Sequence, residues 1–294
     1  MSGEQGPIGI IGLGAMGAAL AQSLLNNGME VHVWNRTAEK SVALVQKGAV
    51  QASRPADVCA ASSMIIVCLS DYSAWADILE ASAMREAIKG TTIVQLTTGT
   101  VGEVENHAAL MKHLGAGLIE GSILCFPEQI GTATASIIVA GEQGLVEEHD
   151  KVLRAMSPKV SYLGESPTAP VVLGNAIMSS VLGFSAGIIN GAAFCLQEGL
   201  PLEAFKDKTI HNFTRMQTEP IRIIDAILEG DTESTQASVS TWYEAHVKLL
   251  ELSDKLAVDK SFHQGLNAMF KQTINQGRGA HDISAMIKTF TQGK

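Results

Sequence analysis

The sequence of 294 residues is poor in charged residues and in cysteine, and each shortage argues against a class of protein. Charged residues make up 17% of the chain, and the acidic ones outnumber the basic ones, which leaves a net charge of −9. A chain without a basic excess is poorly suited to nucleic acid or to an anionic membrane surface, so neither partner is expected. A hydrophobic content of 46% instead indicates a well-buried globular protein that is long enough for two domains.

The four cysteines (Cys59, Cys68, Cys125 and Cys195) are scattered and form no C-x-x-C pair. Because Cys68 and Cys195 lie in apolar runs, buried free thiols in a reducing cytoplasm are expected rather than disulfides. The eight histidines show no metal-ligand spacing, so no metal site is predicted. The N-terminus lacks the charged and apolar segments of a signal peptide, which agrees with a cytoplasmic location. There are no internal repeats and no low-complexity segments.

The chain does contain a glycine-rich turn near its N-terminus, between an apolar run and a helical stretch. Ile8 to Ile11 suits a buried parallel strand, and Gly12-Leu13-Gly14-Ala15-Met16-Gly17 follows it. Leucines at helical spacing predict a helix over residues 18–26, and a second strand is predicted over residues 31–34. Glycines in this position let the backbone approach a pyrophosphate, whose charge then faces the N-terminus of the helix. The pattern therefore predicts a dinucleotide site.

The residues after the second predicted strand indicate which dinucleotide is bound. An NAD site usually has an acid here that binds the ribose 2′-hydroxyl, whereas this chain has Asn35, Arg36 and Thr37, with Lys40 close behind. Arg36 offers a charge-assisted fork and Thr37 a hydroxyl donor to a 2′-phosphate, which an acid would repel. A solvated basic turn is the alternative for Arg36 taken alone. With the acid also missing, NADPH is the predicted cofactor.

The rest of the N-terminal half alternates between strand and helix patterns. Helices are predicted over residues 37–48, 56–61, around 78–79 and 101–114, and strands over 64–69, 92–96, 118–119, 137–140 and 160–163. Such alternation predicts a doubly wound, mostly parallel α/β sheet, which we assign to a Rossmann domain over residues 1–166. Ligands bind at the carboxyl edge of these sheets, so Leu69, Ser70 and Thr98 are predicted to contact the cofactor.

Residues 167–294 are predicted to form an interdomain helix followed by an all-α domain for dimerisation and substrate binding. The run from Ala169 to Gln197 has no charged residue, which raises the possibility of a membrane span. Asparagines and serines spread along the run argue against a span. Gly183, Gly187 and Gly191 lie four residues apart, so this face suits close packing against another helix, in a bilayer or in water. We expect a long buried helix covered by a second subunit.

The segments after this helix read as further helices. Apolar residues at spacings of three and four predict helices over residues 221–228 and 243–256. Asp282 is the predicted N-cap of a final helix over residues 283–290. An all-helical half with an apolar leading helix buries its surface poorly alone, so dimerisation is expected.

The chain resembles the imine reductases and reductive aminases, a branch of the β-hydroxyacid dehydrogenase superfamily. The motifs that carry the resemblance are Gly12-Leu-Gly-Ala-Met-Gly17, Val33-Trp-Asn-Arg-Thr37, Leu96-Thr-Thr-Gly-Thr100, Pro127-Glu-Gln-Ile-Gly131 and Arg278-Gly-Ala-His-Asp-Ile-Ser-Ala-Met286. The resemblance implies NADPH-dependent reduction of cyclic imines or iminium ions to amines, with reductive amination left open. It also implies a domain-swapped homodimer, with each active site between the Rossmann domain of one subunit and the helical domain of the other.

Two alternatives remain. One is a β-hydroxyacid dehydrogenase-like carbonyl reductase, in which the interdomain helix carries a catalytic lysine. Matched to that pattern, this chain has Val171, which cannot act as a general acid. The other is a non-catalytic NADP-binding protein built on the same scaffold.

The chain also departs from the imine reductases themselves. Many of them carry Asp, sometimes Asn, preceded by Tyr or His, where this chain has Gly174 and Leu173. Asn175, Thr98 and Tyr243 are the candidates for the missing catalytic role, with Trp242 and His246 also considered. The alternatives are an Asn175 that hydrogen-bonds within its helix, a Thr98 that binds only backbone, and aromatic residues that form core or pocket wall. The predicted substrate pocket comprises Leu124, Phe126, Leu173, Gly174, Met178, Trp242 and His246.

Overall fold

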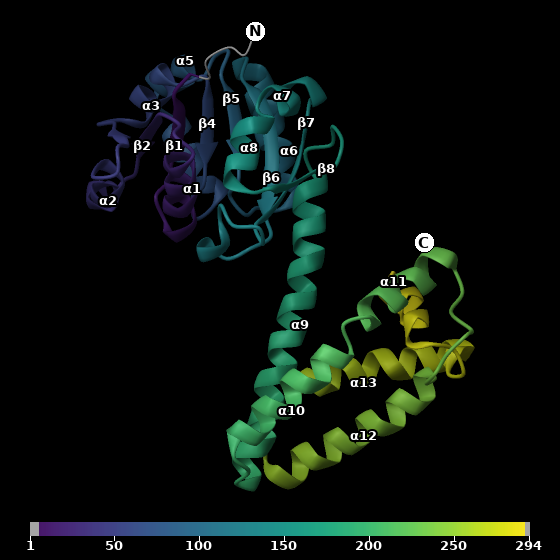
Figure 1. Ribbon diagram of the computed structural model, residues 1–294. Coiled ribbons are helices and arrows are strands. Elements are labelled where there is room, and N and C mark those ends of the chain that lie inside the picture. Colours follow the sequence, from purple (N-terminus) through teal and green to yellow (C-terminus); the bar gives the residue numbers. More distant parts are fainter. Residues whose placement is uncertain (1–5, 292–294) are drawn as a thin grey trace. The chain divides into compact units, whose positions relative to one another are not determined.

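The structure, a computed structural model, describes residues 6–291 (Figure 1). The chain divides into two compact units, Met1–Ser179 and Ser180–Lys294, and the division falls within helix α9 (Ala169–Glu198). The boundary predicted at residue 166 precedes that helix and stays a prediction. The prediction that no signal peptide opens the chain concerns in part residues 1–5, which lie outside the described residues.

The first unit is built on one sheet of eight strands in the order β3-β2-β1-β4-β5-β6-β7-β8. The strands are β1 (Ile8–Ile11), β2 (Val31–Trp34), β3 (Val50–Gln51), β4 (Met64–Val67), β5 (Thr92–Gln95), β6 (Gly117–Ile123), β7 (Ser136–Gly141) and β8 (Lys159–Tyr162). Every neighbouring pair is parallel except β6 and β7. The predicted doubly wound, mostly parallel sheet is therefore confirmed, with the antiparallel pair as an addition that the sequence did not reveal.

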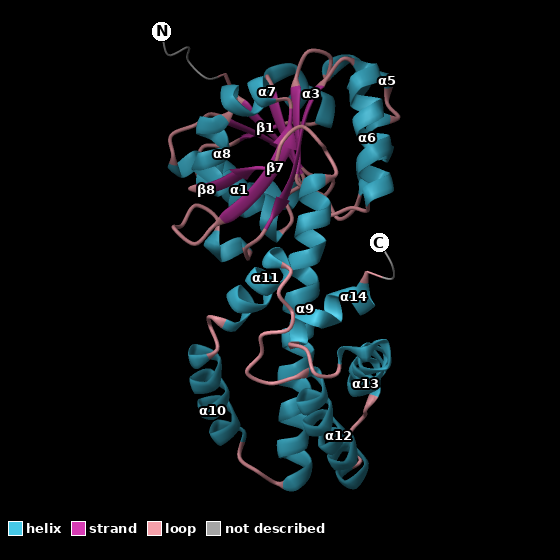
Figure 2. Ribbon diagram, turned by 90° about the vertical axis from the view of Figure 1, so that its right-hand side faces the viewer, coloured by secondary structure: helices cyan, strands magenta, loops and turns pink. Residues whose placement is uncertain are grey.

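Helices cover both faces of this sheet (Figure 2). They are α1 (Ala15–Asn26), α2 (Val42–Val45), α3 (Pro55–Ala61), α4 (Tyr72–Leu79), α5 (Ser82–Ala87), α6 (Val101–Leu114), α7 (Gln143–Glu148) and α8 (Asp150–Met156). Leu20 of α1 and Leu153 of α8 pack on one face, and Trp75 of α4 and Met111 of α6 pack on the other. Because both faces are covered, β1 and β4 are buried along their whole length, which explains their unbroken apolar sequences.

The helix predicted over residues 37–48 is shorter than expected. A 3₁₀ turn (Ala38–Ser41) leads into the single turn of α2, and the chain then turns at Gly48 with φ of 104°. Only Ser41 and Leu44 are buried between residues 38 and 45, so a longer helix would have little apolar surface to pack. The predicted helices over residues 56–61 and 101–114 are confirmed as α3 and α6.

In the second unit the described residues form helices and loops. The helices after α9 are α10 (Leu202–Arg215), α11 (Glu219–Glu229), α12 (Val239–Leu256), α13 (Ser261–Thr273) and α14 (Ile287–Phe290), with a π turn (Ile274–Arg278) and a 3₁₀ turn (Ile283–Met286) before α14. Asp282 is the N-cap predicted from the sequence, since its carboxylate accepts the backbone N–H of Ser284 at 2.9 Å. The predicted final helix is thus a 3₁₀ turn followed by one turn of α-helix.

Helix α9 leaves most of its apolar surface uncovered within the single chain. Leu182 is 61% exposed and Ile189 is 70% exposed. A β-carbon at Gly191 would meet the ring of Phe205 on α10, whereas Gly183 and Gly187 have open space beside them. Across residues 6–291, α9 is the one helix long and apolar enough to cross a membrane by length and composition. The single chain therefore does not bury α9, although the sequence predicts a buried helix.

The four cysteines are free, as the sequence predicts. Burial raises the pKa of the Cys59 thiol to about 12 and that of the Cys68 thiol to about 11. A thiol with so high a pKa is protonated at neutral pH and therefore unreactive.

Candidate functional site

The glycine turn between β1 and α1 has the geometry of a phosphate-binding turn. Gly12 has φ of 101°, and a β-carbon there would overlap the carbonyl of Cys68. A β-carbon at Gly17 would overlap the carbonyl of Gly12. By contrast, no atom lies within 4 Å of the place where a β-carbon of Gly14 would be, so the chain leaves open space there. Glycine is thus needed for packing at two positions, and at Gly14 it keeps space free for a ligand.

The N-terminus of α1 offers unpaired donors to an anion at this open space. Gly14 is the N-cap and provides no side chain to bind the N–H groups of the first turn, which contains no acidic residue. Ala15 is exposed and Met16 is half-buried. Free N–H groups and the positive end of the helix dipole favour a phosphate here. The turn therefore fits the pyrophosphate of a dinucleotide.

The residues after β2 divide into one that holds the turn and others that face solvent. Asn35 accepts the backbone N–H of Leu13 at 2.9 Å and donates to the carbonyl of Thr37 at 2.9 Å, so it ties the glycine turn to the end of β2. Arg36, Thr37 and Lys40 are exposed. Within residues 6–291 Arg36 makes no ion pair, so its guanidinium remains available for a 2′-phosphate.

The loops after β4 and β5 meet at the same edge of the sheet. The hydroxyl of Thr97 accepts the backbone N–H of Leu69 at 3.1 Å, and this bond joins the two loops. Ser70 and Thr98 are exposed at the loop surfaces. The strand order runs outward in both directions from β1 and β4, which makes this edge the switch point where doubly wound sheets bind dinucleotides.

The first turns of α9 belong to the same unit and pack on β6. Val171 is buried against Tyr72 and Val104, so the position matched to the catalytic lysine faces the core. A β-carbon at Gly174 would lie 3.0 Å from the hydroxyl of Ser122, which in turn donates to the carbonyl of Pro170 at 3.0 Å. Gly174 is therefore a close-contact position, where a larger side chain would have to displace Ser122.

Asn175 and the apolar pocket candidates lie near this contact. Asn175 is exposed, and its amide donates to the carbonyl of Val171 at 2.9 Å, which is the intrahelical bond considered from the sequence. In the part of the chain that the structure describes, its amide oxygen accepts no hydrogen bond. The apolar candidates of this unit are Leu124, which is half-buried, and Phe126, Leu173 and Met178, which are exposed.

The three candidates on α12 belong to the second unit and differ in exposure. Trp242 is 41% exposed, whereas Tyr243 packs with its ring centroid 6.4 Å from that of Phe270. His246 is buried and lies 3.2 Å from His263 between ring nitrogens. Of the three, Trp242 is best exposed to contact a substrate, and His246 is part of the helical core.

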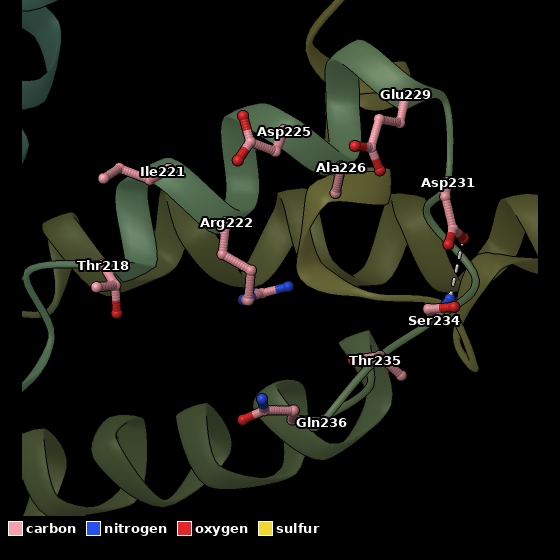
Figure 3. A pocket seen from close by; sticks show the side chains of 10 residues that line it. All are labelled: Thr218, Ile221, Arg222, Asp225, Ala226, Glu229, Asp231, Ser234, Thr235 and Gln236. Carbon is pink, nitrogen blue, oxygen red and sulfur yellow. Dashed lines mark hydrogen bonds between the residues drawn. The ribbon is translucent and has the colours of Figure 1, made fainter.

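A hollow of about 630 Å³ lies beside α11 in the second unit (Figure 3). Its lining residues are Thr218, Ile221, Arg222, Asp225, Ala226, Glu229, Asp231, Ser234, Thr235 and Gln236. Arg222 reaches from α11 to Glu219 at 2.7 Å and to the capping carboxylate of Asp282 at 2.9 Å. The pair with Glu219 lies within α11, whereas the bond to Asp282 connects α11 to the C-terminal turns, which is a structural role for Arg222. Over the described residues, no group of three or more His, Cys, Asp or Glu could hold a metal ion.

The sequence reasoning missed two residues at the sheet edge, Tyr72 and Glu120. The hydroxyl of Tyr72 donates to the buried carboxylate of Glu120 on β6. An acid directly after the apolar pair Leu118-Ile119, which is predicted as a strand, is the signal that could have found Glu120. Tyr72 is the first residue of α4, after the loop that follows β4 at the edge where ligands bind.

The fold and the glycine turn together define a dinucleotide-binding protein of the Rossmann type. Residues 7–164 match the family model described as the NAD binding domain of 6-phosphogluconate dehydrogenase. Because the match covers more than half of the chain, this protein belongs to that family.

The relatives of known activity are reductases that act on C=N or C=O bonds. The chain is 28% identical over 298 positions to the NADPH-dependent reductive aminase of Aspergillus oryzae, a match that covers 98% of each chain. It is 26% identical to glyoxylate/succinic semialdehyde reductase 1 of Arabidopsis thaliana, over 96% of this chain and 97% of the relative. The solved structure of the reductive aminase from Aspergillus terreus in complex with NADPH and ethyl-5-oxohexanoate gives a TM-score of 0.90 at 29% identity, covering 98% of this chain and 100% of that one. The predicted resemblance to imine reductases and reductive aminases is confirmed.

Proposed function

We propose that this protein uses NADPH to reduce cyclic imines or iminium ions to amines. The observation that carries the proposal is the combination of an intact phosphate-binding turn, with an exposed Arg36 beside it, and a helix α9 that lacks any titratable side chain from Ala169 to Gln197 other than Cys195. The reductive aminases that the chain resembles bind NADPH. NADPH is therefore the cofactor we assign.

The chemistry of the substrate explains why an uncharged α9 suffices. When bound, NADPH supplies the hydride. A protonated imine becomes a neutral amine on accepting it, so the site need not deliver a proton during transfer. A ketone leaves negative charge on oxygen and requires an acid or strong donors. Asn175 can accept the N–H of a protonated imine through its amide oxygen, and Thr98 lies exposed at the end of β5.

A carbonyl reductase is the alternative that the Arabidopsis relative favours. Val171, which stands where that enzyme class carries its catalytic lysine, is buried and offers no acid. The case against carbonyl reduction rests on the whole of α9, because no lysine, acid, histidine or tyrosine occurs between residues 169 and 197 in any register. Helix α9 therefore cannot supply a conventional general acid.

We further propose that the protein is a cytoplasmic homodimer whose partner covers α9. The exposed apolar side chains of this helix, together with an apolar groove of about 620 Å³ between α9 and α10, support an association that removes them from water. In a domain-swapped dimer, Trp242 and Tyr243 of one subunit would complete the site of the other. Their catalytic and pocket roles stay predictions.

The decisive experiment follows NADPH oxidation with a cyclic imine, its N-methyl iminium analogue and a matched ketone. We expect turnover of both nitrogen compounds and little turnover of the ketone. Asn175→Ala should slow the imine, which has an N–H when protonated, and leave the N-methyl iminium unchanged. Ser179→Ala, on the same exposed helix, is the control and should affect neither.

Two outcomes would overturn the proposal. Fast ketone turnover without imine turnover would establish the carbonyl reductase alternative. Tight NADPH binding without turnover of any substrate would instead indicate a non-catalytic NADP-binding protein.

A further inference from the structure

Four polar side chains are buried together under the carboxyl edge of the sheet, on the face covered by α4 and α6. Glu120 on β6 is 2% exposed, Tyr72 is 7%, His107 is 5% and Trp75 is 1%. The core around Trp75 is otherwise apolar. A buried carboxylate costs stability unless its donors are well placed, and an apolar side chain would pack here at lower cost. Stability alone therefore does not explain the cluster.

Two hydrogen bonds link these four side chains in pairs. The indole N–H of Trp75 donates to Nε2 of His107 at 2.9 Å, so the neutral ring carries its proton on Nδ1. Nδ1 lies 3.7 Å from Oε2 of Glu120, which is beyond hydrogen-bond distance, and the hydroxyl of Tyr72 donates to Oε1 of the same carboxylate. Burial raises the pKa of Glu120 despite these donors. The cluster thereby connects α4, α6 and β6.

The ring of Tyr72 lies beside two segments of the candidate site, the loop over residues 97–100 and the start of α9. A β-carbon at Gly99 would overlap the ring, so the loop over residues 97–100 rests directly on it. Val171, in the first turn of α9, belongs to the same small buried cluster as Tyr72 and Val104. Thr98 lies in that loop, and Gly174 and Asn175 lie one turn along α9. The position of Tyr72 thus sets the position of both segments.

The arrangement of the cleft indicates which part of the cofactor is affected. Arg36 follows β2, on one side of the switch point, where the 2′-phosphate end of a dinucleotide binds. The loops after β4 and β5 lie on the other side, where the remaining half of the molecule extends. Tyr72, which begins α4 after β4, lies on this second side.

We propose that Tyr72 and Glu120 are positioning residues for the nicotinamide half of the cleft. Their hydrogen bond fixes the ring on which the 97–100 loop and the start of α9 rest. The inference rests on the proposed binding of NADPH. It predicts that removing the Tyr72–Glu120 bond weakens binding of the nicotinamide half of the cofactor and leaves binding of the adenosine half unchanged.

The test measures binding of NADPH and of adenosine 2′,5′-bisphosphate by calorimetry, with thermal melting of each variant as a check of folding. Tyr72→Phe keeps the ring and removes the hydroxyl. We expect NADPH to bind about tenfold more weakly, the size of one lost hydrogen bond to a charged group, and adenosine 2′,5′-bisphosphate to bind as before. Tyr162→Phe is the matched control, because the Tyr162 hydroxyl donates at 3.0 Å to the carbonyl of Gly141 on β7, outside the cluster.

Two further variants keep the proposal testable if Tyr72→Phe folds poorly. Gly99→Ala pushes the loop off the ring and should reproduce the selective loss of NADPH affinity. Glu120→Gln keeps an acceptor oxygen for Tyr72 and should bind NADPH more tightly than Glu120→Leu. Equal effects on both ligands, or lower melting temperatures with unchanged binding, would show a purely structural cluster. If the unmodified protein binds neither ligand, the assignment of NADPH fails as well, which separates the two failures.

Discussion

Gly14→Ala adds one methyl group at the point where the chain turns from β1 into α1. The backbone there has φ of −65° and ψ of −177°, which alanine adopts without strain. No atom lies within 4 Å of the added carbon, so no existing contact is disturbed. The methyl group instead occupies the space that we assign to the pyrophosphate.

The expected cost to folding is close to zero, because two small effects oppose each other. Alanine is a poorer N-cap than glycine, by roughly 0.5–1 kcal/mol, whereas losing glycine reduces the entropy of the unfolded chain by about 0.4–1 kcal/mol. The expected cost to binding is larger. Preventing the backbone from approaching the phosphate should raise the Kd of NADPH at least about tenfold, or about 1.4 kcal/mol.

Urea denaturation and NADPH calorimetry on the same preparation measure the two quantities. Gly102→Ala is the matched control, since this glycine also has open space and lies in the first turn of α6. It should leave NADPH binding unchanged and raise stability by at most about 1 kcal/mol. Gly17→Ala should lose stability, because its β-carbon would overlap the carbonyl of Gly12. If Gly14→Ala binds NADPH like the parent protein, the phosphate does not lie at this turn.

Three further predictions follow from other parts of the molecule. Arg36→Ala should weaken NADPH binding by about 1.5–3 kcal/mol and leave NADH binding unchanged. If the variant binds NADPH as tightly as the parent does, the role of Arg36 is refuted. As the pH rises above 4.5, the ordinary pKa of glutamate, the parent should lose stability relative to Glu120→Gln, because the folded state holds the proton of the Glu120 carboxyl more tightly than the unfolded state. Urea denaturation over a pH series measures this, and a constant difference between the two proteins would contradict the raised pKa. Gly187→Leu should dissociate the proposed dimer without unfolding the subunit, since space is open beside Gly187. Sedimentation that shows a soluble monomer of the unmodified chain would exclude the dimer.

The local patterns of the sequence were sufficient for the glycine turn, the mostly parallel sheet and the Asp282 cap. Each depends on residues close together in the chain: apolar runs for buried strands, a glycine where a β-carbon would overlap, and a carboxylate two residues before the N–H it binds. The absence of an acid beside Arg36 is equally a local feature. These parts follow from short-range sterics and hydrogen bonding, which neighbouring residues determine by themselves.

Only the tertiary structure decided how distant residues combine at the sheet edge. Gly174 reads as a missing acid in the sequence, whereas the structure shows that α9 approaches Ser122 too closely for a side chain to fit easily. Val171 reads as a lost lysine, whereas it packs against Tyr72. The pairing of Tyr72 with Glu120 joins residues 48 positions apart and depends on how α4 packs on β6. Such contacts arise from the packing of whole elements against one another, so no pattern within a single element could have predicted them.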